Sequence, residues 1–581
     1  MMKTFSTDFE FWSLTGANPK PWCVAWHCLD TGEEGTLWLD GTSMPSPFPK
    51  EFRMVAHYAL AELGCFMELG WPLPTEVIDT LAEARTVRGQ VAPAGGSWGL
   101  LAVANQLGIS TMSSDHKNEM RELAMGEQIP VDRRRQLMEY CLEDVHTGLA
   151  IWCALEPSVN LPEAVLRGRY LKALAYVERR GIPADVDLVE SLRSKSPDIL
   201  DALWINAREA YGGVIQENGE FSSKAWLQWC AGNGVPWPLL SSGAPALDAD
   251  TFKKMSDRFP EIRIMAYARK LRGQSRRFDF ALGEDGRLRC MLSPFGSDTG
   301  RNQPSNSKYI FGASAWARSV VAAPTGTVLA YIDYCSEEVG VAAAVAGDKV
   351  LLADYLTSDP YMAFAIRAGA ARGGATKKSH PQVRAIYKLA TLSLQYGIGD
   401  ISLAQNLGIP IPAARRLIRD HQDAYPAFWR WRSAIVDEVM CGGTLSTRYG
   451  WQRKAKPKDS ANSIANFPVQ AAGGEVLRVA TIALEEAGHR VVAPVHDALL
   501  VEMDEVGWQE ELAEIRRLMS RAAEVVTGGL SIPTDVELVF PGENYLDGRG
   551  TDFWKIAAPV LGRGPYRLPE VGRSQLLESQ I

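Results

Sequence analysis

The sequence lacks the features that mark membrane, secreted and cysteine-rich zinc proteins. In 581 residues, no apolar run approaches the roughly 18 residues of a membrane span, and the start, MMKTFSTDFEFW, has no apolar core of a signal peptide. The nine cysteines form no CxxC pair, which argues against a zinc site and a disulfide framework. We therefore expect a protein of the reducing cytoplasm with no membrane partner.

An excess of positive charge is also lacking, because 61 Lys and Arg stand against 69 Asp and Glu, for a formal net charge of −8. This balance argues against non-specific binding of nucleic acid by the whole surface, but it leaves room for a local basic groove. Internal repeats and low-complexity tracts are missing. The length exceeds what one core can organise, so about two to four domains are expected.

The hydrophobic pattern predicts mixed helix and sheet content. The first 155 residues form an α/β unit by this pattern, with a strand at TFSTDFEFW, and TVLAYIDY (327–334) is an apolar run typical of a buried strand. A tail from about 560 is expected to be irregular. Helical spacing is expected over 51–70, 133–153, 160–290 and 360–440.

Two aspartates stand at the edges of apolar strands. Asp333 lies near the end of TVLAYIDY, and Asp497 lies in VVAPVHDALLVE (491–502), at the fold-back between two apolar runs. Either acid alone is typical of a turn or a cap. Because a buried carboxylate is costly unless it is paired or binds a metal, two such acids fit a pair that shares divalent ions, as in two-metal phosphoryl transfer. Oxygen ligands favour magnesium.

Between these aspartates, HPQVRAIYKLATLSLQYGIG (380–399) carries Arg384, Lys388, Leu392 and Tyr396 at four-residue steps, on one face of a helix. A solvated stripe is one interpretation of the two cations. Leu392 and Tyr396 continue the same face, which a solvated stripe does not require. A face with cations at one end and an aromatic ring at the other suits a nucleoside triphosphate.

Together these stretches resemble the motifs of family A DNA polymerases. The family's first motif, Asp-Tyr-Ser-Gln-Ile-Glu-Leu-Arg, corresponds to DYCSEEVG (333–340), and its third, Val-His-Asp-Glu, corresponds to VHDA (495–498). The second motif, with Arg, Lys, an aromatic residue and Tyr-Gly, corresponds to the helix over 384–397. The resemblance covers roughly residues 160–555, and it implies template-directed DNA synthesis with two Mg²⁺ ions in the active site, Mn²⁺ being an alternative.

The resemblance implies roles for individual residues. Its metal ligands in the palm are Asp333, Tyr334 and Asp497. Its nucleotide-binding residues are Arg384, Lys388, Leu392, Tyr396 and Glu338. Among these, Lys388 would also protonate the leaving pyrophosphate, and Glu338 would crowd the sugar 2′ position. Its contacts to primer–template DNA are Arg301 in SDTGRNQPS (297–305), Asn466, Gln470 and His496. The minor-groove acceptors are alike for all base pairs, so contacts there suit a check of pair geometry.

The sequence departs from the family pattern at four positions. Leu392 stands for the aromatic residue of the second motif, and Ala498 stands for the acid that closes the third. Gly340 and Asn462 each stand where an arginine is expected. The metal-binding aspartates remain, so we expect the chemistry to survive and nucleotide selection to differ.

The N-terminal unit resembles a proofreading 3′–5′ exonuclease of the DEDD type with a tyrosine. Asp8 and Glu10 lie on one face of a strand because side chains alternate, and Tyr140 and Asp144 in YCLEDV are one helical turn apart. A solvated strand face is the alternative interpretation of the first pair. The resemblance implies that the three acids bind metal and that Tyr140 orients the attacking water.

The remaining acid of this exonuclease-like site is open between two residues. AHYALAEL (56–63) resembles the His-Asn-Ala-x-Phe-Asp segment of the family, and the acid there is Glu62. Asp79, in VIDT, is the rival, although its family counterpart is more often structural. We take Glu62 as the metal ligand.

The sequence therefore predicts an α/β and α+β multidomain protein. An RNase H-like exonuclease domain precedes a right-hand polymerase domain with palm, fingers and thumb. The expected partners are primer–template DNA and dNTPs, with a processivity factor or other replisome proteins in phage DNA replication. The expected domains are the exonuclease domain 1–155, thumb and start of the palm 160–320, palm with the first metal motif 321–360, fingers 361–440, and palm with the second metal motif and C-terminal tail 441–581.

Two alternative functions remain on the same residues. A single-subunit RNA polymerase shares this palm and lacks the acid at position 498, but Glu338 and the exonuclease-like unit argue against it, because an RNA polymerase must admit a 2′-hydroxyl. A non-catalytic DNA-binding protein on a polymerase scaffold is disfavoured because Asp333 and Asp497 are both retained.

Overall fold

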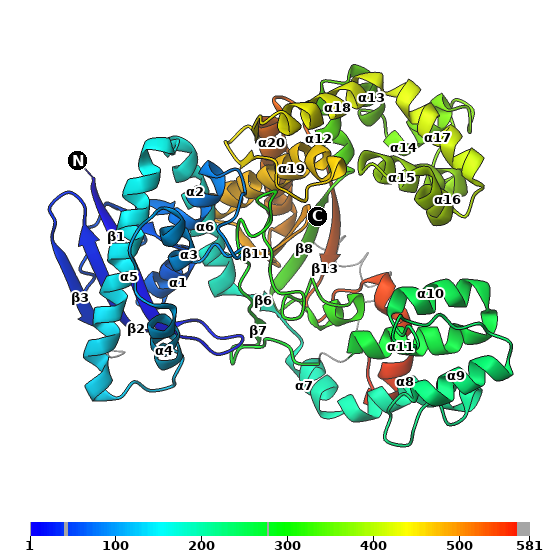
Figure 1. Cartoon of the computed structure of the whole chain (residues 1–581), viewed down its shortest axis with the longest axis horizontal. Coiled ribbons are helices and arrows are strands. Elements are labelled where there is room, and N and C mark those ends of the chain that lie inside the picture. Colours follow the sequence, from blue (N-terminus) through cyan, green and yellow to red (C-terminus); the bar gives the residue numbers. More distant parts are fainter. Residues whose placement is uncertain (1, 40–43, 276–277, 566–581) are drawn as a thin grey trace.

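The computed structural model describes residues 2–39, 44–275 and 278–565. Figure 1 shows a central sheet, with an α/β unit built from the N-terminal residues on one side and two helical units on the other. Within the described ranges, no helix is long and apolar enough to cross a membrane.

The N-terminal unit is built on a five-stranded sheet of order β3-β2-β1-β4-β5. The strands β3, β2 and β1 pair antiparallel, whereas β1, β4 and β5 pair parallel. A long helix, α5 (Arg134–Leu155), packs along β1, β2, β3 and β4, and it confirms the helix expected over 133–153. The strands are β1 (Lys3–Trp12), β2 (Lys20–Cys28), β3 (Glu34–Trp38), β4 (Phe52–Ala56) and β5 (Glu76–Asp79).

The helix expected over 51–70 is wrong in its first part. Residues Phe52–Ala56 form β4, and the helix α1 begins only at Leu60 and ends at Glu68. The segment FRMVA is a mostly apolar stretch of five residues that includes Arg53, and a stretch of that length cannot be assigned to strand or helix by periodicity. Its parallel pairing with both β1 and β5, which are distant in sequence, decides for the strand.

The central sheet has the order β11-β12-β8-β13, and all of its pairs are antiparallel. The strand β8 lies between two neighbours and is mostly buried, which explains the apolar run that predicted it. Two helices, α19 (Ala461–Glu486) and α20 (Trp508–Thr527), pack on each other and on this sheet. The strands are β8 (Thr327–Tyr334), β11 (Arg490–Val495), β12 (Ala498–Asp504) and β13 (Thr534–Val539).

The two helical units each have their own apolar core. One runs from α12 (Glu337–Ala346) to α18 (Pro426–Met440) and contains α15 (Pro381–Gln395). The other runs from α8 (Ser196–Tyr211) to α11 (Arg263–Ser275) around the buried Trp226. Both confirm the helices expected there, and Figure 1 shows them on the side of the central sheet away from the N-terminal unit. The division of the chain into exonuclease, thumb, palm and fingers stays a prediction.

The helix α6 (Leu161–Arg180) joins the N-terminal unit to the central sheet by close packing. It contacts β5 and α1 on one side and α19 on the other. At Gly168, an added Cβ atom would lie 1.9 Å from the carbonyl oxygen of Val77, so only glycine permits this approach. Arg167 donates two hydrogen bonds to the buried Glu83 carboxylate, at 2.7 and 2.6 Å. The two units are therefore held firmly at this helix.

The C-terminal helix α21 (Thr551–Leu561) returns to pack on α8. The irregular tail expected from about 560 falls largely on residues 566–581, which lie outside the described residues.

Candidate active site

The two aspartates at strand edges come together on the central sheet. Asp333 lies near the end of β8, and its sheet partner on β12 is Ala498, the residue after Asp497. The backbone N–H of Tyr334 donates a hydrogen bond to the carbonyl oxygen of Asp497 at 3.2 Å. Burial, followed by the negative charge of Asp497, raises the pKa of Asp333 to about 7. The two carboxylates thus repel each other in a partly desolvated site, which cations would relieve.

The turn that presents Asp497 is strained. Val495 and Ala498 pair directly, so His496 and Asp497 form a two-residue hairpin turn. His496 has a φ of 54°, a conformation that glycine usually provides at the first position of such turns. For a residue with a Cβ atom, this left-handed backbone conformation is about 1–2 kcal/mol less favourable than a right-handed one. Strain of this kind is typical of functional sites, and burial lowers the pKa of the His496 side chain.

A third acid, Asp535, was not found from the sequence. It lies on β13 directly opposite Asp333, and its charge contributes to the raised pKa of Asp333. The alternation of acids in TDVELV was the available signal, but only the order of the sheet places Asp535 beside Asp333. The carboxylates of Asp333 and Asp497 fit divalent cations of the magnesium type, and the exposed Asp535 adds negative charge beside them.

Glu337 is a further acid that the sequence did not single out. It is 2% exposed, and its Oε1 atom has no hydrogen-bond partner among the described residues. Burial raises its pKa to about 8, and the positive charge of Arg301 opposes this shift. Arg301 also donates from Nε to the carbonyl oxygen of Gln470 at 3.0 Å. Arg301, expected at the DNA, therefore lies against the central sheet unit, beside Glu337.

The cationic face of α15 is turned toward the paired acids. Arg384 and Lys388 lie over the ring of Tyr361, at 4.9 and 5.8 Å from its centroid. Arg384 also donates to Asp359 at 3.0 Å. The charge of Lys388 lowers the pKa of Asp333, against the effect of burial, so the two motifs act on the same site. Leu392 is half-buried and packs against the apolar core of the α12–α18 unit.

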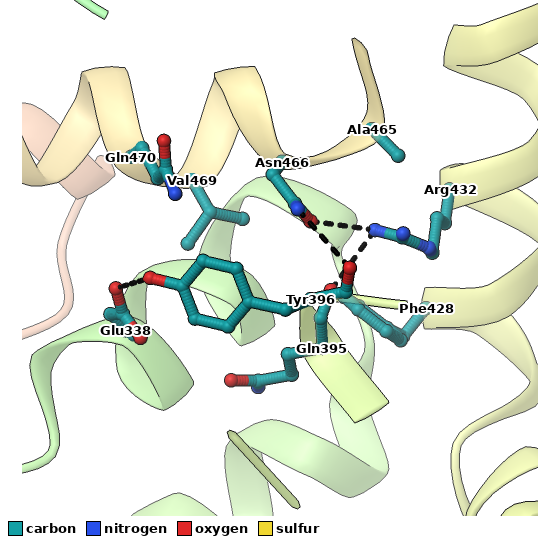
Figure 2. A pocket seen from close by; sticks show the side chains of 9 residues that line it. All are labelled: Glu338, Gln395, Tyr396, Phe428, Arg432, Ala465, Asn466, Val469 and Gln470. Carbon is teal, nitrogen blue, oxygen red and sulfur yellow. Dashed lines mark hydrogen bonds between the residues drawn. The ribbon is translucent and has the colours of Figure 1, made fainter. Parts of the chain in front are cut away.

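Tyr396, at the end of α15, lines a pocket together with three other residues that the sequence predicted: Glu338, Asn466 and Gln470. Figure 2 shows the Tyr396 hydroxyl donating to the Glu338 carboxylate across this pocket. Burial raises the pKa of Tyr396 to about 12, so the hydroxyl keeps its proton. The structure therefore connects the first motif to the second by a hydrogen bond.

Arg432, on α18, anchors the backbone beneath Tyr396 and was missed by sequence reasoning. Its guanidinium donates to the Gln395 carbonyl at 3.0 Å and to the side-chain oxygens of Asn466 at 2.9 Å and Asn462 at 2.8 Å. These asparagines in turn donate to the carbonyl oxygens of Tyr396 at 3.3 Å and Gly397 at 2.9 Å. Where the resemblance expects an arginine at position 462, the guanidinium of Arg432 thus arrives from another helix. Figure 2 shows Arg432 beside Asn466 and Tyr396.

The acids of the N-terminal unit also gather. Asp8 and Glu10 on β1 and Cys141 on α5 offer ligand atoms that all lie within 4.8 Å of one another. Burial, followed by the charge of Asp144, raises the pKa of Asp8 to about 8. Burial also raises the pKa values of Glu10 and of Tyr140, which is 4% exposed.

Glu62 and Asp79 differ in how their oxygens are used. Asp79 accepts hydrogen bonds from the backbone N–H groups of Tyr58, Ala59, Leu81 and Ala82, at 3.3, 3.1, 2.8 and 3.2 Å. It therefore caps a helix, α2 (Thr80–Val87). The Oε2 atom of Glu62 has no such partner in the part of the chain that is described. Burial raises the pKa of Glu62, and the charge of Asp8 adds to the shift.

Lys117 places its ammonium group beside the acids of the N-terminal unit, and the sequence did not predict this contact. It lies on α4 (Ser114–Ala124), and its Nζ atom is 2.5 Å from Asp144 Oδ2. The other oxygen of Asp144, Oδ1, has no hydrogen-bond partner among the residues described. A buried carboxylate oxygen of this kind, beside the two further acids Asp8 and Glu10, fits a site that binds divalent cations.

The central sheet with its paired acids, faced by a helix of cations, is the arrangement of a polymerase fold. Residues 284–547 match the model of DNA polymerase family A. A DNA polymerase of Mycobacterium phage D29 is 25% identical over 406 residues, which cover 66% of this chain and 63% of the relative. A thermostable DNA polymerase I of Thermus caldophilus is 27% identical over 252 residues, or 40% of this chain and 28% of the relative.

The fold as a whole has a solved counterpart. The Pol domain of Pol1 from M. smegmatis, in complex with DNA primer-template and dNTP, matches with a TM-score of 0.72. Its sequence is 20% identical, and the structural match covers 93% of this chain and 95% of the Pol1 chain. The likeness to family A DNA polymerases is carried by residues 284–547, just under half of the chain. The chain spans less than two thirds of the length of the two curated relatives above.

Proposed function

We propose that this protein is a template-directed DNA polymerase that adds dNTPs to the 3′ end of a primer. The observation that carries the proposal is the meeting of Asp333 and Asp497 on the central sheet, within the electrostatic reach of Lys388. The match of residues 284–547 to the family A model supports it, as do relatives named DNA polymerase. We infer that the central sheet unit is the palm and that the α12–α18 unit contains the fingers.

The described residues divide the work of the reaction. Arg384 and Lys388 bind the triphosphate of the incoming nucleotide, and Lys388 donates a proton to the leaving pyrophosphate. Tyr396 packs against the new base pair, and His496 lies near the primer end. Asp333, Asp497 and the backbone of Tyr334 would hold two Mg²⁺ ions, or Mn²⁺ as an alternative, and the bound ions would supply positive charge for the attacking and leaving oxygens.

Contacts to the primer–template follow from the same geometry. Asn466 and Gln470 line the pocket beside Tyr396, where a newly formed base pair would present its minor groove. Their amides suit a check of pair shape, since the acceptors there are alike for all pairs. Arg301 supports this surface by donating to the Gln470 carbonyl.

The N-terminal unit is proposed to be a 3′–5′ proofreading exonuclease of the RNase H-like type. Its support is the grouping of Asp8, Glu10 and Asp144 with Tyr140. The Oε2 atom of Glu62, which has no hydrogen-bond partner within the described ranges, adds to this support. The D29 relative and a DNA polymerase of Mycobacterium phage L5, 24% identical over 400 residues, support a role in phage DNA replication. Replisome proteins, a processivity factor among them, are the further partners that this role implies.

Primer extension on a defined template with Mg²⁺ tests the proposed function. The wild-type protein should extend with dNTPs and discriminate strongly against rNTPs. Extension with rNTPs at a comparable rate would favour the RNA polymerase alternative. A lack of extension with either substrate, despite primer–template binding, would favour the non-catalytic DNA-binding alternative.

Glu338→Ala should raise rNTP incorporation relative to dNTP incorporation by at least about tenfold, which is about 1.4 kcal/mol at the transition state. The Tyr396 hydroxyl fixes the Glu338 carboxylate in one orientation, so its bulk is held where it would crowd the sugar 2′ position. The measurement is kcat/KM for one matched nucleotide of each kind. Tyr396→Phe keeps the ring and releases the acid, so its ratio should fall between wild type and Glu338→Ala. An unchanged ratio in an active Glu338→Ala enzyme would remove Glu338 from this role.

Arg432→Leu should lower kcat/KM for a matched dNTP about tenfold, because it leaves the carbonyl oxygen of the buried Gln395 without this donor. A buried acceptor that loses its donor costs about 1–3 kcal/mol. Arg432 is a positioning residue: it donates to Asn466, which in turn donates to the carbonyl oxygen of Tyr396. The variant would therefore hold the backbone of Tyr396 less firmly. Single-nucleotide incorporation measures the effect. Arg430→Leu, an exposed change two residues away on α18, is the matched control and should behave as wild type. A lower Tm with unchanged kcat/KM would contradict the positioning role.

A further inference from the structure

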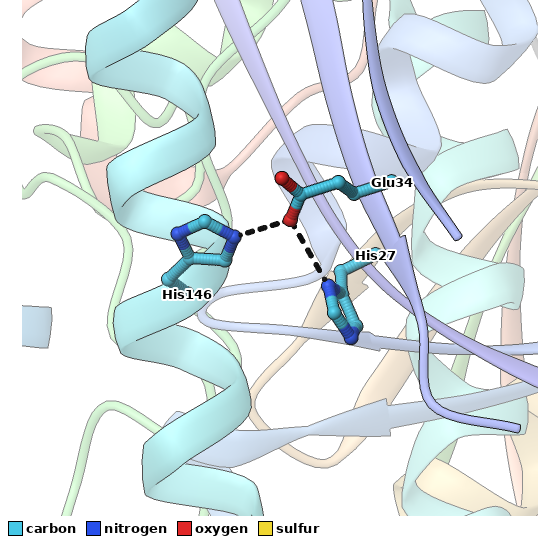
Figure 3. A group of neighbouring side chains, drawn as sticks. All are labelled: His27, Glu34 and His146. Atoms are coloured by element: carbon cyan, nitrogen blue, oxygen red, sulfur yellow. Dashed lines mark hydrogen bonds and ion pairs between the residues drawn. The ribbon is translucent and has the colours of Figure 1, made fainter. Parts of the chain in front are cut away.

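A group of two histidines and one glutamate lies on the N-terminal unit, apart from both acidic sites. His27 on β2 and Glu34 on β3 are directly opposite each other in the sheet, and His146 comes from α5. Figure 3 shows both imidazole rings turned toward the Glu34 carboxylate. The side chains of Glu34 and His146 are 44% and 48% exposed, and that of His27 is 22% exposed, so the group opens to solvent.

The ring nitrogens converge on a single oxygen. His27 Nδ1 is 3.2 Å and His146 Nε2 is 2.7 Å from Glu34 Oε2, and the three atoms all lie within 4.8 Å of one another. Ligands of a tetrahedral zinc ion, bound at about 2.0–2.1 Å, are about 3.3 Å apart. The observed separations are therefore within a small side-chain adjustment of zinc coordination. Both ring nitrogens already point at the carboxylate oxygen, and a zinc ion would take the place of the protons that they donate to it.

The chemistry of the three donors selects the class of metal. Two imidazoles and one carboxylate suit zinc and its neighbours in the first transition row, whereas magnesium and calcium prefer oxygen alone. Three protein ligands leave a fourth position open, and the exposure of the group allows water to fill it. The alternative is that the three residues form only an ion-pair cluster without a metal. A surface ion pair contributes about 0–1 kcal/mol to the free energy of unfolding, so such a cluster would add little to stability.

We propose that His27, Glu34 and His146 form a binding site for one Zn²⁺ ion. The ion fastens the hairpin of β2 and β3 to α5, since the ligands come from all three elements. This helix also carries Tyr140 and Asp144, so zinc binding stabilises the scaffold of the neighbouring acidic group without taking part in its chemistry. The proposal does not depend on the proposed polymerase or exonuclease activities.

A zinc titration of the full-length chain tests the site. The only other group of potential ligands that the described residues bring this close, Asp8, Glu10 and Cys141, is disabled in an Asp8→Ala/Glu10→Ala background. Chelator-treated protein is titrated calorimetrically with Zn²⁺ in excess Mg²⁺, which occupies the remaining carboxylate sites. We expect one zinc site per chain, and a Tm that rises with zinc concentration as expected for a ligand of the folded state.

Matched variants locate the site. His146→Ala and, separately, Glu34→Gln should weaken zinc binding at least about tenfold, or about 1.4 kcal/mol, and abolish the zinc-dependent rise in Tm. His380→Ala removes an exposed histidine on the fingers, and Glu33→Gln removes the exposed acid next to Glu34; neither should change binding. All of these positions are on the surface, so folding should survive. Equal zinc affinity in wild type and both site variants, or no zinc binding in wild type, would overturn the proposal.

Discussion

Asp333→Asn and Asp497→Asn should each slow primer extension by at least about a thousandfold, a loss of about 4 kcal/mol of transition-state stabilisation. Each change keeps the shape of the side chain and removes the negative charge that a divalent ion needs. Asp333 shares its site with Asp497 and Asp535, and burial, followed by the charges of these two acids, raises its pKa to about 7. Primer–template affinity should stay within about threefold of wild type, because phosphate contacts elsewhere supply most of it.

Rapid-quench incorporation of a single matched dNTP measures the chemical step, and fluorescence anisotropy with labelled primer–template measures binding. Asp535→Asn is the matched control, since it removes a carboxylate from the same rung of the sheet but from an exposed position on β13. It should slow extension much less than either of the other two changes. Extension near the wild-type rate by Asp333→Asn or Asp497→Asn would contradict their assignment as metal ligands.

The sequence predicted the parts of this site that are local. The end of TVLAYIDY and the fold-back at VHD are visible as polar residues that interrupt apolar runs. The structure places Asp333 near the end of β8 and Asp497 in the turn between β11 and β12, at the same end of the central sheet. The four-residue steps from Arg384 to Tyr396 are likewise a property of one helix, α15. Patterns with a period of 2 or 3.6 residues are contained within a single element, so one sequence is enough to find them.

The parts that were missed depend on pairing between distant segments. Asp535 becomes a neighbour of Asp333 only because β13 pairs with β8 rather than with β11. Arg432 lies in FWRWRSAI, where nothing marks it as buried, and its importance follows from the approach of α18 to α19. The strand β4 was mistaken for the start of a helix for the same reason, since its pairing with β1 and β5 is not written in FRMVA itself.

Asp8→Ala combined with Glu10→Ala should abolish degradation of a single-stranded 3′ end, by at least about a thousandfold, and should leave dNTP incorporation unchanged. The two carboxylates lie beside Asp144 in a group where burial raises the pKa of Asp8 to about 8. Their removal takes away the charge that divalent cations require. Polymerisation is spared because Asp333 and Asp497 lie on a different sheet. The measurement is hydrolysis of a labelled oligonucleotide beside primer extension by the same preparation.

Hydrolysis of the labelled oligonucleotide also decides whether Glu62 or Asp79 is the metal ligand. A melting curve then distinguishes the loss of a metal ligand from the loss of a helix cap. Glu62→Gln should reduce hydrolysis at least about a hundredfold, about 2.7 kcal/mol, with little change in Tm, because one of its oxygens has no hydrogen-bond partner among the described residues. Asp79→Ala removes an acceptor of four backbone N–H groups, so it should lower stability by about 1–2 kcal/mol as the loss of a helix cap does. Hydrolysis by the folded Asp79→Ala protein should persist. Full hydrolysis by Glu62→Gln, together with its loss in a folded Asp79→Ala protein, would reverse the assignment and make Asp79 the metal ligand.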